Sequence, residues 1–421
     1  MINKRIVITG IGPICSLGIG KEELWKNVLL NNSQPVKEMN RLDVGKNDSF
    51  YVYRLKRNDY RELNRIYAAD NKKESKDFLF LATAAKLALV DSKLSKEIIY
   101  KDTVLIVSHE SPELGNFYDL IINETYKTKF KNKKISKANY TKYLYSNLSK
   151  SAYNLQSFMF LFRIAKYLNI HGFTQYINNA CASGLYGIES ASQHIKLNKC
   201  KAALVVAGDH PDFYKYLWFK RIGLYSPNGQ LRPFDANSNG FVFGEGAVGI
   251  VFEDLEHARK RKATIYGEYL GGGFSQDCWK VSFPAIKEKH YENAFVQALA
   301  ISKIKKKDVD LIVPHGVGNY IIDRFEAEVI KNIYIEHRLP LISAFKPYFG
   351  HNLGGSALLE TALLLLAIKN RQVPATLNIK QKHPRINLDL VDRNTRKKIN
   401  CAVKMACGFA GYNAVAVFKR L

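Results

Sequence analysis

The residues with the clearest chemical potential surround Cys181. The segment 178–184 reads NNACASG, a strand-like stretch at 173–177 precedes it, and an apolar pattern of helical spacing begins at Leu185. We therefore predict that Cys181 occupies a tight strand-to-helix turn of small residues at a helix N-terminus. There the helix dipole and free N–H groups stabilise a thiolate and can bind an oxyanion. A cysteine is usually a buried structural residue, but this arrangement is typical of a catalytic nucleophile.

Two of the ten histidines lie in similar glycine-rich turns. His315 follows the strand-like segment 311–314 and precedes Gly316, and His351 follows Gly350 and precedes a helix. A helix dipole is expected to hold such a histidine neutral, so that its uncharged imidazole can donate a hydrogen bond. Taken singly, each is more often a packed or surface residue. Beside a thiolate nucleophile, both become candidate partners in catalysis.

Strand-like and helical segments must position these residues, and they alternate along the whole chain. Such alternation predicts α/β architecture with buried sheets. Glycine-rich turns follow strands in both halves, which is compatible with an internal duplication. Strands are predicted at 5–9, 103–107, 202–207, 248–252, 311–313, 341–344 and 414–418, and helices at 22–30, 78–91, 324–334 and 357–368.

Length and composition are those of a soluble globular protein. The 421 residues are 47% hydrophobic and 24% charged, enough for one large fold or two fused cores. The N-terminus lacks the pattern of a signal peptide, and the apolar run 362–368 is too short to span a bilayer, so we expect no membrane and a cytoplasmic location. The six cysteines have no metal-ligand spacing, so we expect reduced thiols and no metal.

The net charge of +25 favours an acidic partner through long-range attraction. No zinc finger, aromatic nucleic-acid motif or helix-turn-helix pattern accompanies the charge, so no nucleic-acid partner is predicted. The segment Lys127–Lys150 is the richest in lysine, and it could be a docking surface or a polar insertion. A lysine-rich bias spread over a solvated surface explains the charge equally well.

Several motifs occur together in an order that resembles the elongating β-ketoacyl-acyl-carrier-protein synthases over nearly the whole chain. Each motif is weak alone, but their order and their strand–turn contexts agree. The matching segments are 5–12 (RIVITGIG), 180–184 (ACASG), 232–235 (RPFD), 240–247 (GFVFGEGA), 315–318 (HGVG), 346–351 (KPYFGH) and 408–411 (GFAG).

This resemblance implies the thiolase fold in an obligate dimer. Two similar α/β halves, residues 1–255 and 256–421, would pack as a five-layer αβαβα sandwich. The dimer could be a homodimer, or a heterodimer with a subunit like the chain-length factor of a type II polyketide or polyene system. The resemblance also implies that an acyl carrier protein delivers the substrates on its phosphopantetheine arm, so that no metal or freely diffusing cofactor is needed.

The same resemblance implies a Cys-His-His site. Cys181 would accept an acyl group, and the backbone N–H groups of Cys181 and Phe409 would form an oxyanion hole. His315 and His351 would hydrogen-bond the thioester carbonyl of malonyl carrier protein and promote its decarboxylation to an enolate. Phe409 resembles the gating aromatic residue of the family. Lys346 and Glu326 match positions of a charged pair that supports the site.

The chemistry of these residue types agrees with the resemblance. A Claisen condensation needs a soft nucleophile that is also a good leaving group, and a thiolate is both. It also needs donors for an oxyanion and neutral donors for an enolate. The reaction predicted for this chain is therefore a decarboxylative condensation that extends an acyl chain in fatty-acid or type II polyketide synthesis.

Some positions depart from the family pattern around the substrate arm. Val317 and Asn319 stand where hydroxyl residues usually hydrogen-bond the pantetheine arm, and valine cannot make that bond. Asn178, Asn179 and Tyr412 replace the usual hydroxyl residues near the nucleophile and the C-terminal turn. These changes favour a specialised synthase, for a polyketide or polyene, over a housekeeping fatty-acid enzyme.

Three alternatives remain open from the sequence. A non-elongating, chain-length-determining subunit would lack the nucleophile, and the presence of Cys181 argues against it. A thiolase acting on coenzyme A would carry a second cysteine in a Cys-x-Gly turn, whereas Gly408 follows Cys407 directly. A binding module, for nucleic acid or for acyl groups without turnover, would form no acyl-enzyme.

Overall fold

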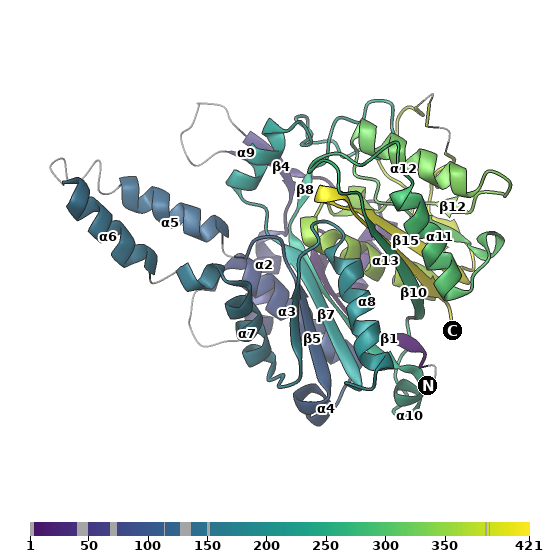
Figure 1. Ribbon diagram of the computed structural model, residues 1–421, viewed down its shortest axis with the longest axis horizontal. Helices are drawn as coiled ribbons and strands as arrows, with labels where there is room; N and C mark the ends of the chain where they lie inside the picture. The colour runs from purple at the N-terminus through teal and green to yellow at the C-terminus, as the bar shows by residue number, and fades with distance from the viewer. Residues whose placement is uncertain are drawn as a thin grey trace.

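A computed structural model describes residues 4–39, 49–67, 74–112, 114–126, 136–149, 152–383, 385–386 and 388–421. Its main sheet follows the strand order β12-β11-β15-β16-β10-β1-β9-β7-β5-β6 (Figure 1). The N-terminal strands are β1 (Ile6–Cys15), β5 (Thr103–Ser108), β6 (Thr174–Ile177), β7 (Ala202–Asp209) and β9 (Gly246–Asp254). The C-terminal strands are β10 (Gly267–Gln276), β11 (Leu311–Val313), β12 (Leu341–Ile342), β15 (Cys401–Cys407) and β16 (Tyr412–Lys419).

The two sets of strands repeat one topology. Each set has five strands. When they are numbered along the chain, their order in the sheet is third, second, fourth, fifth, first: β6-β5-β7-β9-β1 and β12-β11-β15-β16-β10. In both, the first two pairings of that order are parallel and the last two antiparallel. Antiparallel pairing of β1 with β10 joins the sets. The turn after β6, which carries Cys181, is therefore equivalent to the segment after β12, which carries His351.

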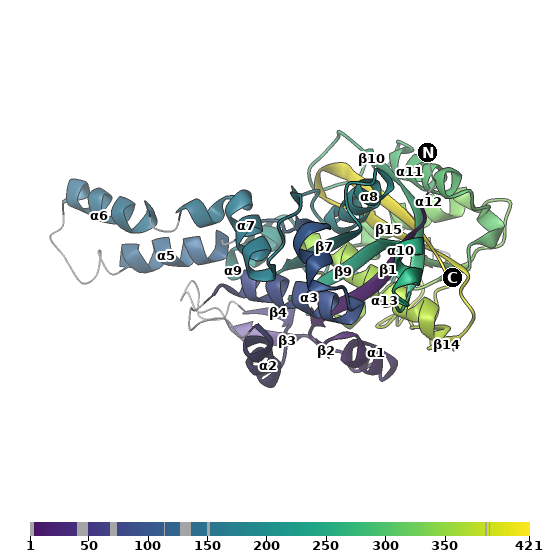
Figure 2. The same ribbon diagram turned by 90° about the horizontal axis from the view of Figure 1, so that it is seen from below.

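Helices cover both faces of the strands and fill the space between the two sets, giving five layers (Figures 1 and 2). One outer layer holds α3 (Lys76–Ser92) and α7 (Ser157–Leu168), and the other holds α11 (His290–Ser302) and α12 (Tyr320–Ile333). Between the sheets lie α8 (Ser183–Lys196) and α13 (Ser356–Asn370). A helix in a middle layer has little solvent-facing surface, which explains why α13 is apolar on nearly every side, with Glu360 as a buried exception.

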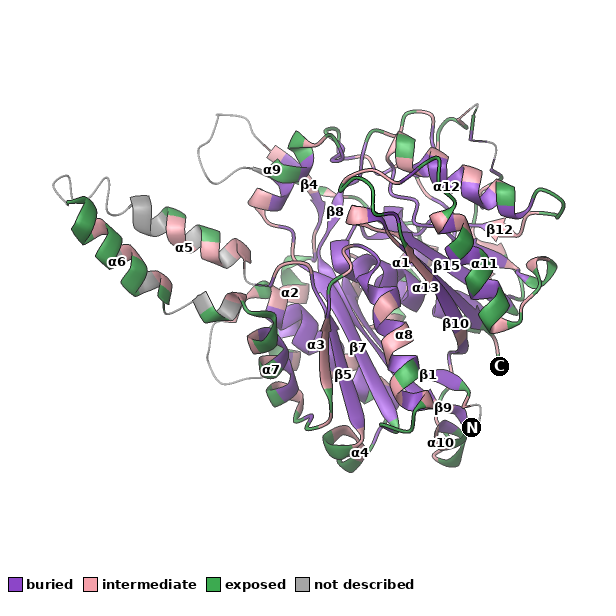
Figure 3. Cartoon of the chain, in the orientation of Figure 1, coloured by how far each residue is buried: buried purple, intermediate pink, exposed green. Residues whose placement is uncertain are grey.

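The span Leu353–Asn370 is long and apolar enough to cross a membrane by length and composition alone. However, 89% of it is buried inside the protein, as expected for the central helix of a layered fold. Figure 3 shows the same pattern for the sheets, whose strands are buried while the outer helices and connections carry the exposed residues.

The remaining elements surround this core. Two small sheets pair β3 (Val36–Met39) with β4 (Ser49–Tyr53) and β8 (Phe243–Gly244), and β13 (Gln372–Val373) with β14 (Thr395–Arg396). The other described elements are β2 (Gly18–Ile19), α1 (Lys21–Leu29), α2 (Arg57–Tyr67), α4 (Lys96–Lys101), α5 (Leu114–Tyr126), α6 (Lys137–Ser149), η2 (Ala152–Leu155), α9 (Phe213–Arg221), α10 (Leu255–Lys260), η3 (Lys306–Asp308), η4 (Lys346–Tyr348), η5 (Leu353–Gly355) and η6 (Phe409–Gly411).

Every strand and helix predicted from the sequence is present, with ends shifted by a few residues. The predicted boundary at residues 255–256 falls at the start of α10, between β9 and β10. In the lysine-rich segment, residues 136–149 are described and 137–149 form α6, while 127–135 and 150 lie outside the described residues. Helices α5 and α6 extend away from the layered body in two perpendicular views (Figures 1 and 2).

Candidate active site

Cys181 lies on the turn between β6 and α8, as the sequence predicts. The backbone of Ala180 is left-handed there (φ 49°), and this reversal lets the chain turn directly into the helix. Ser183 holds the turn closed, because its hydroxyl donates to the Ala180 carbonyl at 2.6 Å and accepts from the Asn179 N–H at 2.7 Å. Cys181 is only 2% exposed, so the turn places its thiol inside the protein.

One pocket contains most of the residues singled out in the sequence. Cys181 and Phe409 line it together with both histidines, His315 and His351. The imidazole rings of the two histidines meet edge to face, with centroids 5.5 Å apart. Because these residues come from four separate segments, the fold itself assembles the site.

Phe409 brings a backbone donor to the nucleophile. The backbone N–H groups of Phe409 and Cys181 lie close enough to the Cys181 sulfur to lower the pKa of its thiol, so both are placed to donate to the oxygen of a thioester formed there. Gly408 allows the close approach, since a Cβ there would lie 3.2 Å from the Cys181 nitrogen. The Phe409 ring packs against Trp218 and Phe219 of α9, each with centroids 5.3 Å apart.

Hydrogen bonds fix how the histidines face the pocket. The Lys346 ammonium lies 3.3 Å from His315 Nδ1 and can only donate, so Nδ1 accepts and the proton of the neutral ring resides on Nε2. His351 Nδ1 is 2.6 Å from the Ser356 hydroxyl. In each histidine, Nδ1 therefore contacts a protein side chain, and Nε2 is the ring nitrogen left to bind a substrate.

Both histidines are held neutral, but the cause differs from the predicted helix dipole. Burial lowers the pKa of His315 and of His351 well below the usual value, and the positive charges of Lys346 and Lys404 lower both further. His351 lies two residues before η5 and five before α13, so it is not in the first turn of a long helix. The neutral state predicted from the sequence therefore rests on burial and on nearby lysines.

The predicted pairing of Lys346 with Glu326 is wrong. Lys346 pairs instead with Glu360, at 3.0 Å, where both side chains are fully buried. Glu326 accepts hydrogen bonds from the backbone N–H groups of His315 at 2.7 Å and Gly316 at 2.8 Å, and from the Tyr291 hydroxyl at 3.0 Å. Glu326 thus shapes the turn that carries His315, while Glu360 orients the lysine that touches its ring.

Sequence reasoning also missed Lys404, a second buried lysine of this cluster. Its ammonium lies 3.1 Å from Glu360, so one carboxylate is shared by two cations. The sequence contained a signal for both of the missed residues, Glu360 and Lys404. Glu360 interrupts the apolar run of a helix predicted to be buried, and Lys404 lies within an apolar strand, so each needed an opposite charge nearby.

Val317 and Asn319 both line the pocket, in the positions expected for contact with a substrate arm. Asn319 caps α12, since its side-chain oxygen accepts from the N–H groups of Ile321 at 3.1 Å and Ile322 at 3.3 Å. Its amide NH₂ can still donate into the pocket, whereas the Val317 side chain offers only apolar contact.

In the resting protein the thiolate form of Cys181 is disfavoured. Burial raises the pKa of Cys181, and the nearby Glu110 carboxyl raises it further, while Lys346 and the two backbone N–H groups oppose this rise. The resting thiol is therefore protonated.

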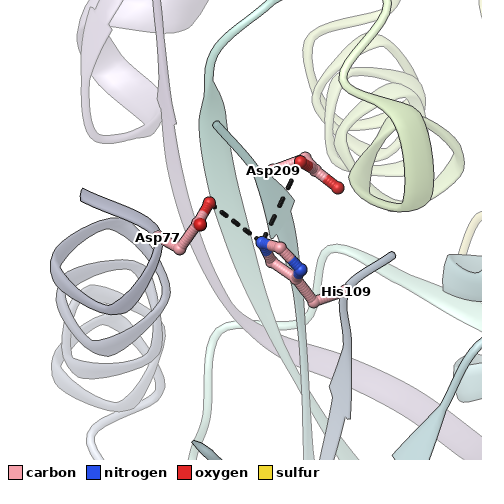
Figure 4. A group of neighbouring side chains, drawn as sticks. All are labelled: Asp77, His109 and Asp209. Atoms are coloured by element: carbon pink, nitrogen blue, oxygen red, sulfur yellow. Dashed lines mark hydrogen bonds and ion pairs between the residues drawn. The ribbon is translucent and has the colours of Figure 1, made fainter. Parts of the chain in front are cut away.

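A second buried polar cluster follows β5 and β7 (Figure 4). His109 Nε2 lies 2.9 Å from Asp77 and 3.9 Å from Asp209, and Asp209 also forms an ion pair with Lys215. Burial lowers the pKa of His109, but Asp209 and Asp77 more than offset this and raise it above the usual value. Asp77 is thus bonded to His109 and Asp209 to Lys215, in a place where Asp77, His109 and Asp209 lie close enough to be candidate ligands of one metal ion.

Comparisons with known proteins agree with this geometry. Residues 3–258 match the family described as "Beta-ketoacyl synthase, N-terminal domain", and residues 266–380 match its C-terminal domain. A 3-oxoacyl-[acyl-carrier-protein] synthase 2 from Coxiella burnetii is 27% identical over the full length of both chains. Nodulation protein E from Rhizobium sp. (strain N33) is 32% identical over 62% of this chain and 64% of that protein.

Solved structures share the fold. The ishigamide ketosynthase/chain length factor superposes with a TM-score of 0.86 at 24% identity, covering all of both chains. A structure of a type II PKS acyl-carrier protein in complex with its ketosynthase gives a TM-score of 0.81 at 23% identity, again over all of both chains. The repeated five-strand topology is therefore that of the thiolase-fold ketosynthases, and the matched domains show that this chain belongs to the β-ketoacyl synthase family.

Proposed function

We propose that the protein is a β-ketoacyl synthase that carries its acyl substrate as a thioester on Cys181. The observation that supports this most directly is the convergence of Cys181, His315, His351 and the Phe409 N–H on one pocket. The acyl group arrives as a thioester on the phosphopantetheine arm of an acyl carrier protein. The Cys181 sulfur attacks its carbonyl, the carrier thiol leaves with a proton, and the N–H groups of Cys181 and Phe409 stabilise the tetrahedral oxyanion.

The second half-reaction uses the histidines. Malonyl carrier protein binds with its thioester carbonyl facing His315 Nε2 and His351 Nε2. As the carboxylate leaves as CO₂, the electron pair of the broken C–C bond forms an enolate, and both N–H groups stabilise its oxygen. The enolate carbon attacks the acyl-Cys181 carbonyl, and the Cys181 thiolate is expelled as the β-ketoacyl chain forms on the carrier protein. All groups come from the chain and the carrier arms, so no further cofactor is needed.

Peptide-resolved mass spectrometry tests the acyl-enzyme. After incubation with an acyl carrier protein charged with a labelled acyl group, we expect the label on the peptide that contains Cys181. Cys278 is the internal control, because it is the exposed cysteine and reports non-specific acylation. A label found on Cys278 or Cys407 instead of Cys181 would contradict the assignment of the nucleophile.

The carrier protein is proposed to dock beside the pocket at two exposed lysines. Acyl carrier proteins are typically acidic, and residues 282–284 of this chain line the pocket while Lys280 and Lys287 are exposed beside them. One of the solved structures with this fold likewise holds a type II PKS acyl-carrier protein in complex with its ketosynthase. A second copy of the chain or a subunit of the chain-length-factor kind completes the proposed assembly, which we place in the cytoplasm.

Salt is expected to weaken carrier-protein binding steeply. From about 0.1 M to about 1 M salt the Debye length falls from about 10 Å to about 3 Å, which screens the attraction between exposed charges. The double variant Lys280→Glu/Lys287→Glu should weaken binding roughly 10-fold at low salt by turning attraction into repulsion. Fluorescence anisotropy with a labelled carrier protein measures both effects.

The chain offers a matched control for this prediction. Lys305 and Lys307 precede the N-terminal end of β11, whereas His315 follows its C-terminal end. The variant Lys305→Glu/Lys307→Glu changes the net charge equally but leaves the surface around the pocket intact. Equal weakening by both double variants, or an affinity that salt does not change, would rule out electrostatic docking at the pocket.

A further inference from the structure

Lys404 is a fully buried cation directly behind the pocket. It lies on β15, and its ammonium donates to the carbonyls of Pro314 at 3.0 Å and Met405 at 2.6 Å. Its third contact is Glu360, at 3.1 Å. Pro314 immediately precedes His315, so Lys404 holds the strand end from which that histidine projects. With no exposed surface, Lys404 can act on a substrate only through other residues.

A chain of contacts connects Lys404 to the catalytic ring. Lys404 shares the Glu360 carboxylate with Lys346, which lies 3.0 Å from Glu360 and 3.3 Å from His315 Nδ1. Glu326 is the second buried carboxylate of this region, and it holds the backbone of His315. The ammonium groups of Lys404 and Lys346 and the carboxylates of Glu360 and Glu326 thus lie behind the histidines, and the formal charges of these four balance. Asp323, on the same helix as Glu326, is buried too, but burial raises its pKa to about 8, which favours its uncharged form near neutral pH.

Removing one cation from this cluster would leave an excess negative charge beside two imidazoles. A nearby negative charge favours the protonated form of a histidine. Protonated His315 could no longer accept a hydrogen bond from Lys346 at Nδ1, so the lysine and the ring would repel each other. We propose that Lys404 is a positioning residue: by balancing Glu360 and Glu326, it keeps His315 and His351 in the neutral, N–H-donating form that decarboxylation needs. This role rests on the proposed function.

The charged groups that face this region come from every element packed around it. Glu360 lies on α13, Lys346 on η4, and Glu326 and Asp323 on α12. The other titratable groups here are Tyr291 of α11, Cys407 of β15 and the two histidines. Burial lowers the pKa of Lys404 to about 8, although Glu360 opposes the shift, so the lysine stays mainly charged near neutral pH. Its positive charge is one of the causes that lower the pKa of each histidine.

Variants at the two ends of the Lys404–Glu360 contact should have opposite effects. Lys404→Met removes a positive charge, so the midpoints at which the histidines titrate should rise by roughly one pH unit. Glu360→Gln removes a negative charge, so the same midpoints should fall. Two readouts report this: the acid limb of malonyl-carrier-protein decarboxylation, and the NMR titration of ¹³C-labelled histidine, assigned with His315→Ala and His351→Ala. Melting curves establish that each variant is folded.

The double variant Lys404→Met/Glu360→Gln separates charge from packing. It disturbs the core more than either single variant but restores the charge balance, so its histidine midpoints should return toward wild type. If Lys404→Met alone does not fold, the double variant compared with Glu360→Gln still tests whether charge balance sets the histidine midpoints. Lys215→Met, which removes another buried lysine paired with a carboxylate, should leave the midpoints unchanged.

The outcomes separate this inference from the proposed function. Absence of decarboxylation in the wild type at every pH would refute the proposed function, while the NMR titration would still report on Lys404. Midpoints that stay the same in Lys404→Met and Glu360→Gln, or that move in the same direction, would overturn the role of Lys404 even in an active enzyme.

Discussion

Cys181→Ala is expected to lose both acyl-enzyme formation and condensation, with a fall in condensation rate of at least about 10³-fold, as for other catalytic nucleophiles. The reason is chemical, because no other side chain can hold the acyl group while the enolate forms. Cys407 also lines the pocket, but it belongs to β15 rather than to the turn before α8. Initial-rate measurement of β-ketoacyl product with purified carrier proteins checks the prediction.

The same variant should still release CO₂ from malonyl carrier protein. Decarboxylation depends on stabilisation of the enolate oxygen, and the residues proposed for that role remain in place. Cys407→Ala is the matched control, because it removes a thiol from the same pocket and should keep condensation within a few-fold of wild type. Condensation that survives in Cys181→Ala and disappears in Cys407→Ala would transfer the nucleophile to the other thiol.

The strand-to-helix turn at Cys181 could be predicted from the sequence because its determinants are local. Small residues at 180–184, a strand before them and a helical pattern after them specify one conformation, and the structure has it. The same holds for the segments that end at His315 and His351. The order of strands in the sheet was not available locally, because parallel neighbours such as β5 and β7 are separated by other elements.

Charge pairing in the core was the part that local patterns could not specify. Lys346 and Glu326 were expected to pair because the resemblance to the family placed both at positions of a supporting charged pair. The structure pairs Lys346 with Glu360 because α13 passes between the sheets and brings one carboxylate against η4 and β15 together. A buried charge in an apolar element predicts that a partner exists, but the packing of distant elements decides which residue it is.

The internal duplication explains why one pocket collects these residues. Cys181 follows β6 and His351 follows β12, and these strands occupy equivalent places in the two repeats. Likewise, His109 follows β5 where His315 follows β11. In the N-terminal repeat His109 is tied to Asp77 and Asp209, whereas in the C-terminal repeat His315 faces the pocket. The same topology thus places Cys181 in one half of the fold and the two pocket histidines in the other.

Loss of either pocket histidine should separate the two half-reactions. His315→Ala and His351→Ala are each expected to slow decarboxylation of malonyl carrier protein by roughly 10²–10³-fold, the usual cost of removing one donor from an oxyanion site. Acylation of Cys181 should persist, because its oxyanion donors are backbone N–H groups. Radiolabelled malonyl carrier protein measures CO₂ release, and intact mass spectrometry measures the acyl-enzyme in the same samples.

A variant that keeps a donor tests whether the N–H group is what matters. His351→Gln retains an amide N–H and should recover part of the decarboxylation that His351→Ala loses. The double variant His315→Ala/His351→Ala should lose less than the product of the single effects, because both donors act on one oxygen. Unchanged decarboxylation in both single variants, with the acyl-enzyme intact, would remove the histidines from the enolate step. Cys181 would then be the one catalytic side chain that the pocket supports.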